Sequence, residues 1–455
     1  PAPCDRSSHG RRGQARRCTP PPGMACELLP ALPVAAAGAV SPCSPQTGTA
    51  CYLLNGRRYA TYTEFEAATE GPRSSPPQPR LAPRGREAAH VLVRRFADAD
   101  GRLHLEELGA LARWEAAELA LDPALLCGGD MPGSLEEHLR HIFLRLDLSG
   151  RGWLGEGEAA AFLALLRRRF GAGAPAPLPR RRLEAHYQLR SKLGEGGQAT
   201  AYLVKELAPS RRERVVKFYP SSGSGANLCA LQAEFEMLRA LDHPRIQRLH
   251  EIFCDAANVC VISDSYTGGD LNSLFYRAAD AGVAVTDVYL ARLLRQVLQG
   301  LAYLHGQCVM HCDLKEPNIM IADEAGLAEP SAVIIDFGLA QDFLADGHRG
   351  GTPGYIPPEV WTQGLWTPRG DVHAMGVVAF QLFSGEACFR GHPSNRALLE
   401  STCGDMPNLE AVAGFTGLGD LLTWMLDKNL HRRPSAQQCM EHAFFEARAA
   451  ARPPP

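Results

Sequence analysis

The chain has 455 residues, of which 45% are hydrophobic and 21% are charged, so it can bury at least one sizeable core and is not disordered throughout. Its length favours two or three domains. The 47 basic and 50 acidic side chains nearly balance, which argues against binding driven by bulk charge, so we expect neither a nucleic-acid partner nor a polybasic membrane tether.

The cysteine pattern and the hydropathy of the chain indicate in which cellular compartment the protein folds. The 14 cysteines include no CxxC pair, which argues against a zinc ribbon and against a small disulfide scaffold. We expect mostly reduced, buried thiols in a cytoplasmic protein. No stretch reaches the roughly 18 to 20 apolar residues of a membrane-spanning helix, so we expect no membrane span. The sequence does not exclude an N-terminal targeting signal. We expect the protein to be a monomer.

Residues 1–85 come first along the chain and mix Pro, Ala, Arg, Ser and Cys without lasting periodicity. A cluster of prolines between residues 76 and 83 closes this stretch. Such a composition buries too little apolar surface to order the backbone, so we predict a disordered extension.

The apolar spacing becomes helical over residues 86–170 and predicts four helices in two pairs. Helix, acidic loop, helix is the outline of an EF-hand, whose twelve-residue loop holds oxygen ligands at positions 1, 3, 5, 7, 9 and 12 around a glycine at position 6. Two loops follow this pattern in register, through Gly101 and Gly152. The segment resembles an EF-hand pair, which implies an all-α unit.

Calcium binding by these two loops stays open. The candidate oxygen ligands are Asp98, Asp100 and Glu107 in the first loop and Asp147, Ser149 and Glu158 in the second. Phe96 stands where the first loop needs its first ligand, and Arg151 stands at position 5 of the second, where a guanidinium would occupy the cation's place. A calcium ion needs six to eight oxygens. The alternative is a metal-free helical pair used for docking or regulation.

Residues 171–186 begin with GAGAPAPLPRRR, which has the composition of a flexible linker. The longest globular stretch follows over residues 187–448, and residues 449–455 form a short tail.

Six short elements follow one another along residues 187–448. They are GEGGQA at 194–199, VVK at 215–217, a predicted helix bearing Glu234, HCDLKEPN at 311–318, DFG at 336–338 and PPE at 357–359. Any one of them could arise by chance, whereas the ordered set has a negligible probability of doing so. The set resembles the signature of the protein kinase family. Two of only five lysines in the chain, Lys217 and Lys315, stand within it.

The resemblance implies an α+β, bilobal protein-kinase fold, with a β-rich N-lobe over residues 187–264 and an α-helical C-lobe over residues 265–448. The all-α EF-hand-like pair precedes this fold. The resemblance also implies ATP and Mg²⁺ as cofactors and proteins as substrates, because phosphoryl transfer depends on positioning and charge neutralisation.

Nucleotide-binding roles follow from the same resemblance. The implied ATP-binding residues are Gly194, Gly196, Gly197, Ala199, Lys217, Ser263, Asp264 and Asp270. Lys217 would hold the α and β phosphates with Glu234 as its counter-ion. Ser263 falls at the gatekeeper position, where a small side chain would open a pocket behind the adenine.

Catalytic and metal-binding roles fall in the second half. Asp313 would orient and deprotonate the substrate hydroxyl, and Lys315 would contact the γ-phosphate. Asn318 and Asp336 would bind magnesium. Thr352 would line the site beside the acceptor, in an arrangement similar to that of serine/threonine kinases rather than tyrosine kinases.

Further residues are expected to support the fold. We expect Glu359 to pair with Arg433, Asp371 to anchor the catalytic loop backbone, and His311 and His373 to pack in the core.

The stretch YTGGDL at residues 266–271 is most similar to the calcium/calmodulin-dependent and calcium-dependent kinase group. In that group the EF-hands follow the kinase domain, whereas here the similar pair precedes it, so the group's autoinhibition does not carry over.

Both halves of a loop-phosphorylation switch are missing from the sequence. Cys312 stands where many kinases have an arginine, and the only Ser or Thr between Asp336 and Glu359 is Thr352. We hypothesise that activity needs no loop phosphate. The sequence thus predicts an ATP-dependent serine/threonine protein kinase and leaves calcium regulation open. The alternative is a calcium-responsive pseudokinase scaffold without catalysis.

Overall fold

The computed structural model describes several stretches of the chain. They are residues 52–54, 57–59, 89–122, 134–171, 177–196, 199–207, 211–220, 225–345, 350–389 and 395–449. All of them belong to one compact unit, Thr47–Pro455. Within the extension predicted to be disordered, the described part is an antiparallel hairpin of β1 (Tyr52–Leu54) and β2 (Arg57–Tyr59). The remainder of that prediction lies outside the described residues.

The described residues of the stretch 86–170 form four helices, the number that the sequence predicts. They are α2 (Ala89–Phe96), α3 (Leu105–Glu118), α4 (Leu135–Leu146) and α5 (Glu156–Phe170). Helix α4 begins at Ser134, whose hydroxyl accepts the Glu137 backbone N–H at 3.2 Å as an N-cap. In the loops before α3 and α5, Leu103 and Leu154 exchange backbone hydrogen bonds of 3.0 and 2.8 Å. Both leucines are fully buried, so this bridge joins the two loops within the core.

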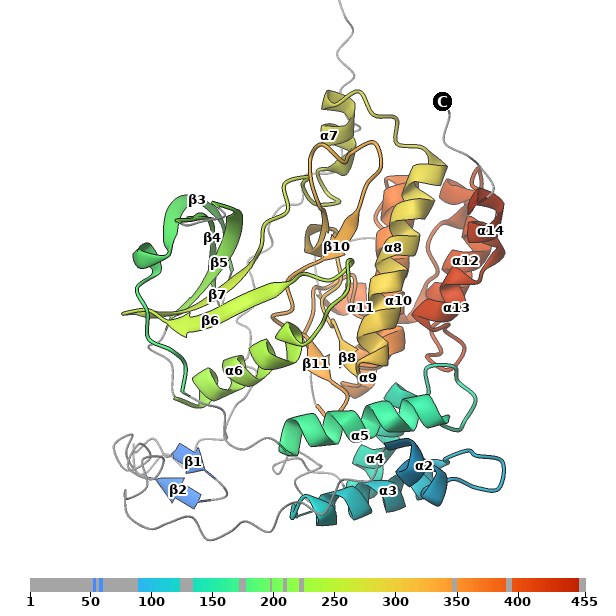
Figure 1. The fold of residues 1–455 in the computed structure, drawn as a ribbon. Coiled ribbons are helices and arrows are strands. Elements are labelled where there is room, and N and C mark those ends of the chain that lie inside the picture. The colour runs from blue at the N-terminus through green and yellow to red at the C-terminus, as the bar shows by residue number, and fades with distance from the viewer. Residues whose placement is uncertain are drawn as a thin grey trace, which may run out of the picture. The chain divides into compact units, whose positions relative to one another are not determined.

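A five-stranded antiparallel sheet follows, in the order β3-β4-β5-β7-β6. Its strands are β3 (Tyr187–Glu195), β4 (Thr200–Glu206), β5 (Glu213–Pro220), β6 (Leu249–Cys254) and β7 (Asn258–Asp264). Val215 lies opposite Ser263 and Lys217 opposite Val261. Because opposite residues and residues two apart share a face, Lys217 and Ser263 point to the same side of the sheet. Helix α6 (Gly225–Arg239) packs against β6 (Figure 1).

The rest of the domain is mainly helical. Its helices are α7 (Leu274–Asp280), α8 (Asp287–Gly306), α9 (Pro358–Gln363), α10 (Pro368–Ser384), α11 (Asn395–Gly404), α12 (Leu418–Met425), α13 (Ala436–Met440) and α14 (Ala443–Ala449). A bilobal fold, rich in sheet in its first lobe and in helices in its second, is therefore present. No helix in the described ranges is long and apolar enough to cross a bilayer.

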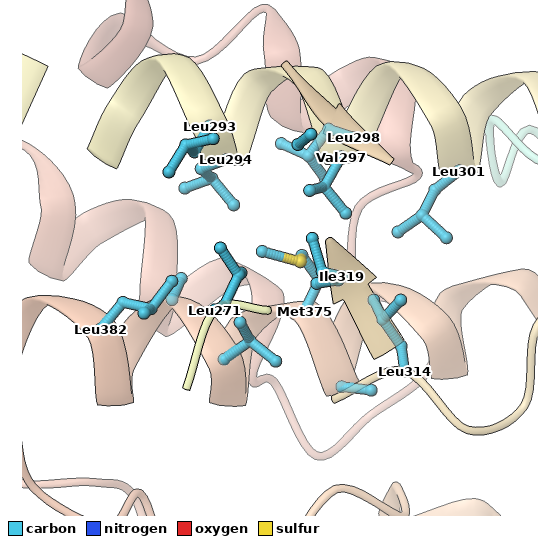
Figure 2. Packing of buried hydrophobic residues seen from close by; sticks show 14 of the residues in the cluster. Leu271, Leu293, Leu294, Val297, Leu298, Leu301, Leu314, Ile319, Met375 and Leu382 are labelled. Carbon is cyan, nitrogen blue, oxygen red and sulfur yellow. The ribbon is translucent and has the colours of Figure 1, made fainter. Parts of the chain in front are cut away.

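The largest core lies around α8 and α10, and it anchors the catalytic loop. Figure 2 shows apolar side chains of α8, including Leu294 and Val297, gathered around Met375 of α10. Leu314 and Ile319, which come from the HCDLKEPN motif and its exit, lie in the same core. Burial of these residues fixes the loop between them.

Two short antiparallel strand pairs bring the catalytic motifs together. Strand β8 (Val309–Met310) pairs with β11 (Gln341–Asp342), and β9 (Ile319–Ile321) pairs with β10 (Ala332–Ile334). The HCDLKEPN motif lies between β8 and β9, and the DFG motif lies between β10 and β11. The pairing therefore places the two motifs side by side.

The described part of the predicted linker lies against the sheet. Arg180 forms a parallel bridge with Cys254, and the Cys254 backbone N–H donates to the Pro179 carbonyl at 2.9 Å. Leu178 and Leu183 pack into the apolar clusters of the sheet. Residues 177–186 therefore differ from the flexible tether predicted, because these two leucines bury in the lobe.

Candidate active site

One buried carboxylate fixes the start of the catalytic loop. Asp371 is fully buried, and its two oxygens accept the backbone N–H groups of His311 and Cys312, each at 2.9 Å. Cys312 has a φ of +63°, which costs a residue with a side chain about 1–2 kcal/mol. The two bonds to Asp371 hold that conformation. The prediction that Asp371 anchors this backbone is confirmed, and His311 and His373 are buried in the core as expected.

Asp313, Lys315 and Thr352 form a closed triangle of polar contacts. The Thr352 hydroxyl donates to Asp313 Oδ1 at 2.6 Å and accepts from Lys315 Nζ at 2.7 Å. Lys315 Nζ also lies 2.8 Å from Asp313 Oδ2. Asn318 Nδ2 donates to the Asp313 backbone carbonyl at 2.8 Å. The structure thus brings together four of the predicted site residues, although Thr352 is distant from the other three in sequence.

Buried ion pairs and hydrogen bonds support this triangle. Glu316 accepts hydrogen bonds of 2.6 Å from the Tyr355 hydroxyl and of 2.6 Å from Gln381 Nε2. The Arg433 guanidinium donates to Glu359 at 2.6 and 3.0 Å, with both side chains almost fully buried. The predicted Glu359–Arg433 pair is therefore confirmed, and Glu316 is a buried structural group.

The nucleotide side of the site has a different arrangement from the one implied by the sequence. The Lys217 ammonium donates to Asp336 Oδ1 at 2.5 Å, and no hydrogen bond or ion pair joins Lys217 to Glu234 within the described chain. Asp336 has a φ of +61°. The implied Lys217–Glu234 pair is thus replaced by a Lys217–Asp336 pair.

These contacts shift the pKa values of both carboxyl groups. Burial raises the pKa of Glu234 to about 7, Lys217 acts against the rise, and the neighbouring Asp336 carboxylate adds to it. Burial also acts to raise the pKa of Asp336, but the charge and hydrogen bond of Lys217 hold it below its usual value. Lys217 therefore favours the ionised form of both carboxyl groups, and only Asp336 also receives its hydrogen bond.

A pocket lies beside Lys217, and its lining includes Glu234, Gln247, Ser263 and Phe337. Ser263 is almost fully buried, as a residue at the back of such a pocket should be. Its hydroxyl accepts a hydrogen bond of 3.0 Å from Gln247 Nε2, and Gln247 Oε1 accepts the Asp336 backbone N–H at 3.2 Å. Sequence reasoning missed Gln247, which stands between Ile246 and Arg248 and belongs to no motif.

The other predicted nucleotide residues lie around this sheet. Gly194 is on β3, and the Gly196 backbone N–H donates to the Ala199 carbonyl at 2.9 Å across the turn; Gly197 lies outside the described residues. Asp264 ends β7, where a hydrogen bond from His250 lowers its pKa with help from Arg214.

Asp270 serves as a turn cap in the structure. Its Oδ1 accepts the Ser273 backbone N–H at 2.9 Å. The carboxylates of Asp264 and Asp270 are therefore both engaged by other groups of the chain.

The first candidate calcium loop is organised by its own backbone. Asp98 Oδ1 accepts the backbone N–H groups of Asp100 and Arg102, each at 2.9 Å. Glu107 accepts the His104 backbone N–H at 3.0 Å at the start of α3. These acidic residues therefore act as loop and helix caps in the structure.

The second loop contains an internal cation. Asp147 accepts the backbone N–H groups of Arg151 and Gly152 at 2.9 and 2.8 Å, and the Ser149 hydroxyl points to Asp147 at 3.4 Å. The Arg151 guanidinium lies 2.9 Å from Glu158, the acid at the twelfth loop position. Burial raises the pKa of Glu158 above its usual value, while the charge of Arg151 acts against the rise. In the described ranges, no three His, Cys, Asp or Glu side chains gather to hold a metal ion.

Comparison with known proteins gives one family. The sequence model of the protein kinase domain matches residues 187–445. The chain is 26% identical over 288 residues, 61% of its length, to the serine/threonine-protein kinase Nek11 of Macaca fascicularis, of which this covers 43%. It is 28% identical over 276 residues, 59% of its length, to the calcium/calmodulin-dependent protein kinase type 1 of Macrobrachium nipponense, of which this covers 77%.

A third relative is the smooth-muscle myosin light chain kinase of Gallus gallus. The chain is 27% identical to it over 269 residues, which are 57% of this chain and 14% of that kinase. The chain therefore spans less than half of two of these three relatives.

Proposed function

The chain belongs to the protein kinase family, and we propose that it is a serine/threonine kinase that transfers the γ-phosphate of ATP to protein hydroxyl groups. One observation carries this proposal. Asp313 holds a hydroxyl, that of Thr352, at 2.6 Å in the position where a general base must hold its proton donor. Lys315 lies against both groups, where its ammonium would meet the transferred phosphate.

The metal donors of this site suit a magnesium ion. Asn318 uses its amide nitrogen on the Asp313 carbonyl, which leaves the amide oxygen available, and Asp336 offers a carboxylate at the Lys217 side. Carboxylate and amide oxygens are the hard ligands that Mg²⁺ prefers. Bound magnesium would neutralise phosphate charge, and Lys217 would then leave Asp336 for the α and β phosphates and for Glu234.

The direct test is phosphate transfer from radiolabelled ATP to a generic basic protein substrate by the full chain. We expect label on serine and threonine after acid hydrolysis, and none above background with Asp336→Ala. Equal labelling by the two proteins would contradict the proposal. No labelling by either would favour the alternative, a scaffold without catalysis.

We also propose that residues 89–171 are an EF-hand-like pair that works without tight calcium binding. The Leu103–Leu154 bridge joins the eighth positions of the two loops, which supports the pairing. Arg151 on Glu158 occupies the place of a cation in the second loop. In the first loop, Phe96 is packed against Trp114 with ring centroids 6.3 Å apart and offers no ligand.

Calorimetry with calcium tests this second proposal. We expect no heat of tight binding from the full chain and unchanged transfer activity with calcium or chelator. Arg151→Asp adds an oxygen ligand and frees Glu158, so it should gain calcium affinity, while Arg140→Asp on the exposed side of α4 should not. Micromolar binding by the unaltered chain, with activity that rises in calcium, would make the pair a calcium sensor instead.

A further inference from the structure

The helical unit, residues 89–171, shares one hydrophobic cluster with the kinase domain. The kinase-domain members of this cluster belong to the catalytic loop, the activation segment (residues 336–359) and their neighbours. They are Cys308, Met310, Cys312, Phe343, Leu344, Ile356, Val360 and Trp366. The helical unit is therefore docked on the elements that position the substrate, rather than attached only through residues 172–176.

Arg145 of α4 is the polar centre of this interface. Its side chain is almost fully buried. Its Nε donates to the Trp366 carbonyl at 2.9 Å, and its Nη1 donates to the Phe343 carbonyl at 2.8 Å. Phe343 lies in the first part of the activation segment and Trp366 lies beyond its end. One guanidinium thus connects the first part of the activation segment to the chain that follows it.

A second arginine makes the reciprocal contact. Arg369 of α10 donates to the carbonyls of Asp147 and Leu148 in the second EF-hand-like loop, at 3.4 and 3.3 Å. Gly150 of that loop has a φ of +72°, and a Cβ there would lie 2.6 Å from the Arg369 guanidinium. Each partner therefore contributes an arginine that satisfies the other partner's backbone carbonyls.

A short path leads from Arg145 to the catalytic triangle. The Trp366 indole donates to the Gly350 carbonyl at 3.1 Å. Gly351 follows with a φ of +133°, and a Cβ there would lie 3.2 Å from the Cys312 carbonyl and 3.3 Å from the Trp366 ring. Thr352 comes next and bonds Asp313. Trp366 is therefore connected to Thr352 through Gly350 and Gly351.

Each hydroxyl side chain of the activation segment is already engaged in hydrogen bonds within the site. Its only Ser, Thr or Tyr residues are Thr352 and Tyr355. Thr352 is bound to Asp313 and Lys315, and the Tyr355 hydroxyl donates to Glu316 at 2.6 Å. Among the cations that contact this segment, Arg145 binds backbone carbonyls, that of Phe343 within the segment and that of Trp366 beyond its end.

We propose that the helical unit is a built-in activator, in which Arg145 holds the activation segment in its working conformation in place of loop phosphorylation. This inference rests on the proposed kinase function, because it names the regulation of the same site. Arg145 is a positioning residue: it touches neither Asp313 nor the nucleotide pocket, and it acts through Phe343 and Trp366.

The test compares Arg145→Met with Arg140→Met in the full chain. Methionine keeps much of the stem and removes the donors, and Arg140 lies on the same helix with its side chain exposed. We expect Arg145→Met to lower kcat by about 10- to 100-fold with the KM for ATP within about twofold, because a small misplacement of the acceptor site is costly while the nucleotide side is distant. Arg140→Met should match the unaltered chain.

Amide hydrogen exchange supplies a readout that needs no activity. Arg145→Met should raise exchange in residues 339–345 and 350–356 and leave β3 to β7 unchanged. Phosphatase treatment of the unaltered chain should not lower its activity. Unchanged kcat and exchange in Arg145→Met, a loss spread over both lobes with a matching rise in KM, or inactivation by phosphatase would each overturn the inference.

A second variant, Trp366→Phe, tests the same inference if Arg145→Met does not fold. Trp366→Phe keeps an aromatic ring and loses only the indole donor to Gly350. A lower kcat with an unchanged KM for ATP would support the proposed path, and an unchanged kcat would overturn it. If the unaltered chain transfers no more phosphate than Asp336→Ala does, the kinase proposal fails. The hydrogen-exchange data alone then test whether Arg145 orders the activation segment.

Discussion

The acceptor side and the nucleotide side of the active site differ in how far their side chains are assembled. On the acceptor side, Asp313, Lys315 and Thr352 are joined by contacts of 2.6 to 2.8 Å. On the nucleotide side, Lys217 is paired with Asp336, and the pKa of the separate Glu234 rises to about 7. The side chains of the first side are already joined, whereas the proposed function requires Lys217 on the second side to exchange its ion-pair partner.

The difference follows from what supports each side. The acceptor side is held by buried bonds: those of Asp371 to the catalytic loop and that of Arg145 to the activation segment. On the nucleotide side, Glu234 comes from a helix that packs on the sheet edge at β6, and Lys217 has two carboxylates nearby, those of Asp336 and Glu234. Buried hydrogen bonds hold the backbone of the acceptor side in one position. Lys217, in contrast, can exchange one carboxylate partner for the other.

Removing Asp313, the proposed general base, should have the largest effect. Asp313→Asn keeps the shape but not the proton acceptor, so we expect kcat to fall by about 100- to 10,000-fold. The measurement is phosphate transfer under saturating ATP. The thermal midpoint should stay close to that of the unaltered chain, and retention of more than a tenth of kcat would show that Asp313 is not the base.

The Thr352 hydroxyl should come next. Thr352→Ala removes contacts to two charged groups, each worth about 1.5–3 kcal/mol, so a loss of about 10- to 100-fold in kcat is expected. Thr352→Ser retains the hydroxyl and should recover most of the activity. Equal activity of the two variants would mean that the triangle is not needed for transfer.

Ser263 sharpens the comparison at the nucleotide side. We expect ATP-site inhibitors with a bulky aromatic group to bind the unaltered chain and to lose about 10- to 100-fold in potency against Ser263→Met, because the larger side chain fills the pocket. Inhibition curves for both proteins provide the measurement. Ser263→Ala is the matched control and should stay sensitive; equal inhibition of Ser263→Met would refute the assignment.

The smallest effect concerns Glu234 and pH. Because its pKa is about 7 in the folded protein and lower in the unfolded chain, the folded state holds the proton more tightly. The resulting stabilisation is complete below about pH 4.5 and is lost as pH rises through 7, by on the order of 3 kcal/mol.

Thermal midpoints between pH 5 and 8 provide the measurement. Glu234→Gln should lack this loss, so its advantage over the unaltered chain should grow with pH. Glu236→Gln, on an exposed part of the same helix, is the control. An equal pH dependence of all three proteins would contradict the shifted pKa.

Particular residues show how far the sequence could reach. The roles of Asp371, Glu359 and Arg433 were predicted correctly because these residues stand in motifs that match the kinase family. Gln247 and Arg145 were missed, since neither belongs to a motif and each has partners distant in sequence. The Lys217–Glu234 pair was implied by resemblance, whereas the structure pairs Lys217 with Asp336.

The sequence by itself determined the family, the order of the catalytic motifs and the four helices before them, because these depend on local periodicity and on residue types that the chemistry requires. Only the tertiary structure decided which partner Lys217 takes and where the helical unit lies. The first depends on two carboxylates competing for one ammonium, and the second depends on Arg145 and Arg369 finding backbone carbonyls more than two hundred residues away. Such contacts involve carbonyl groups that every residue carries, so no residue type in the sequence marks them.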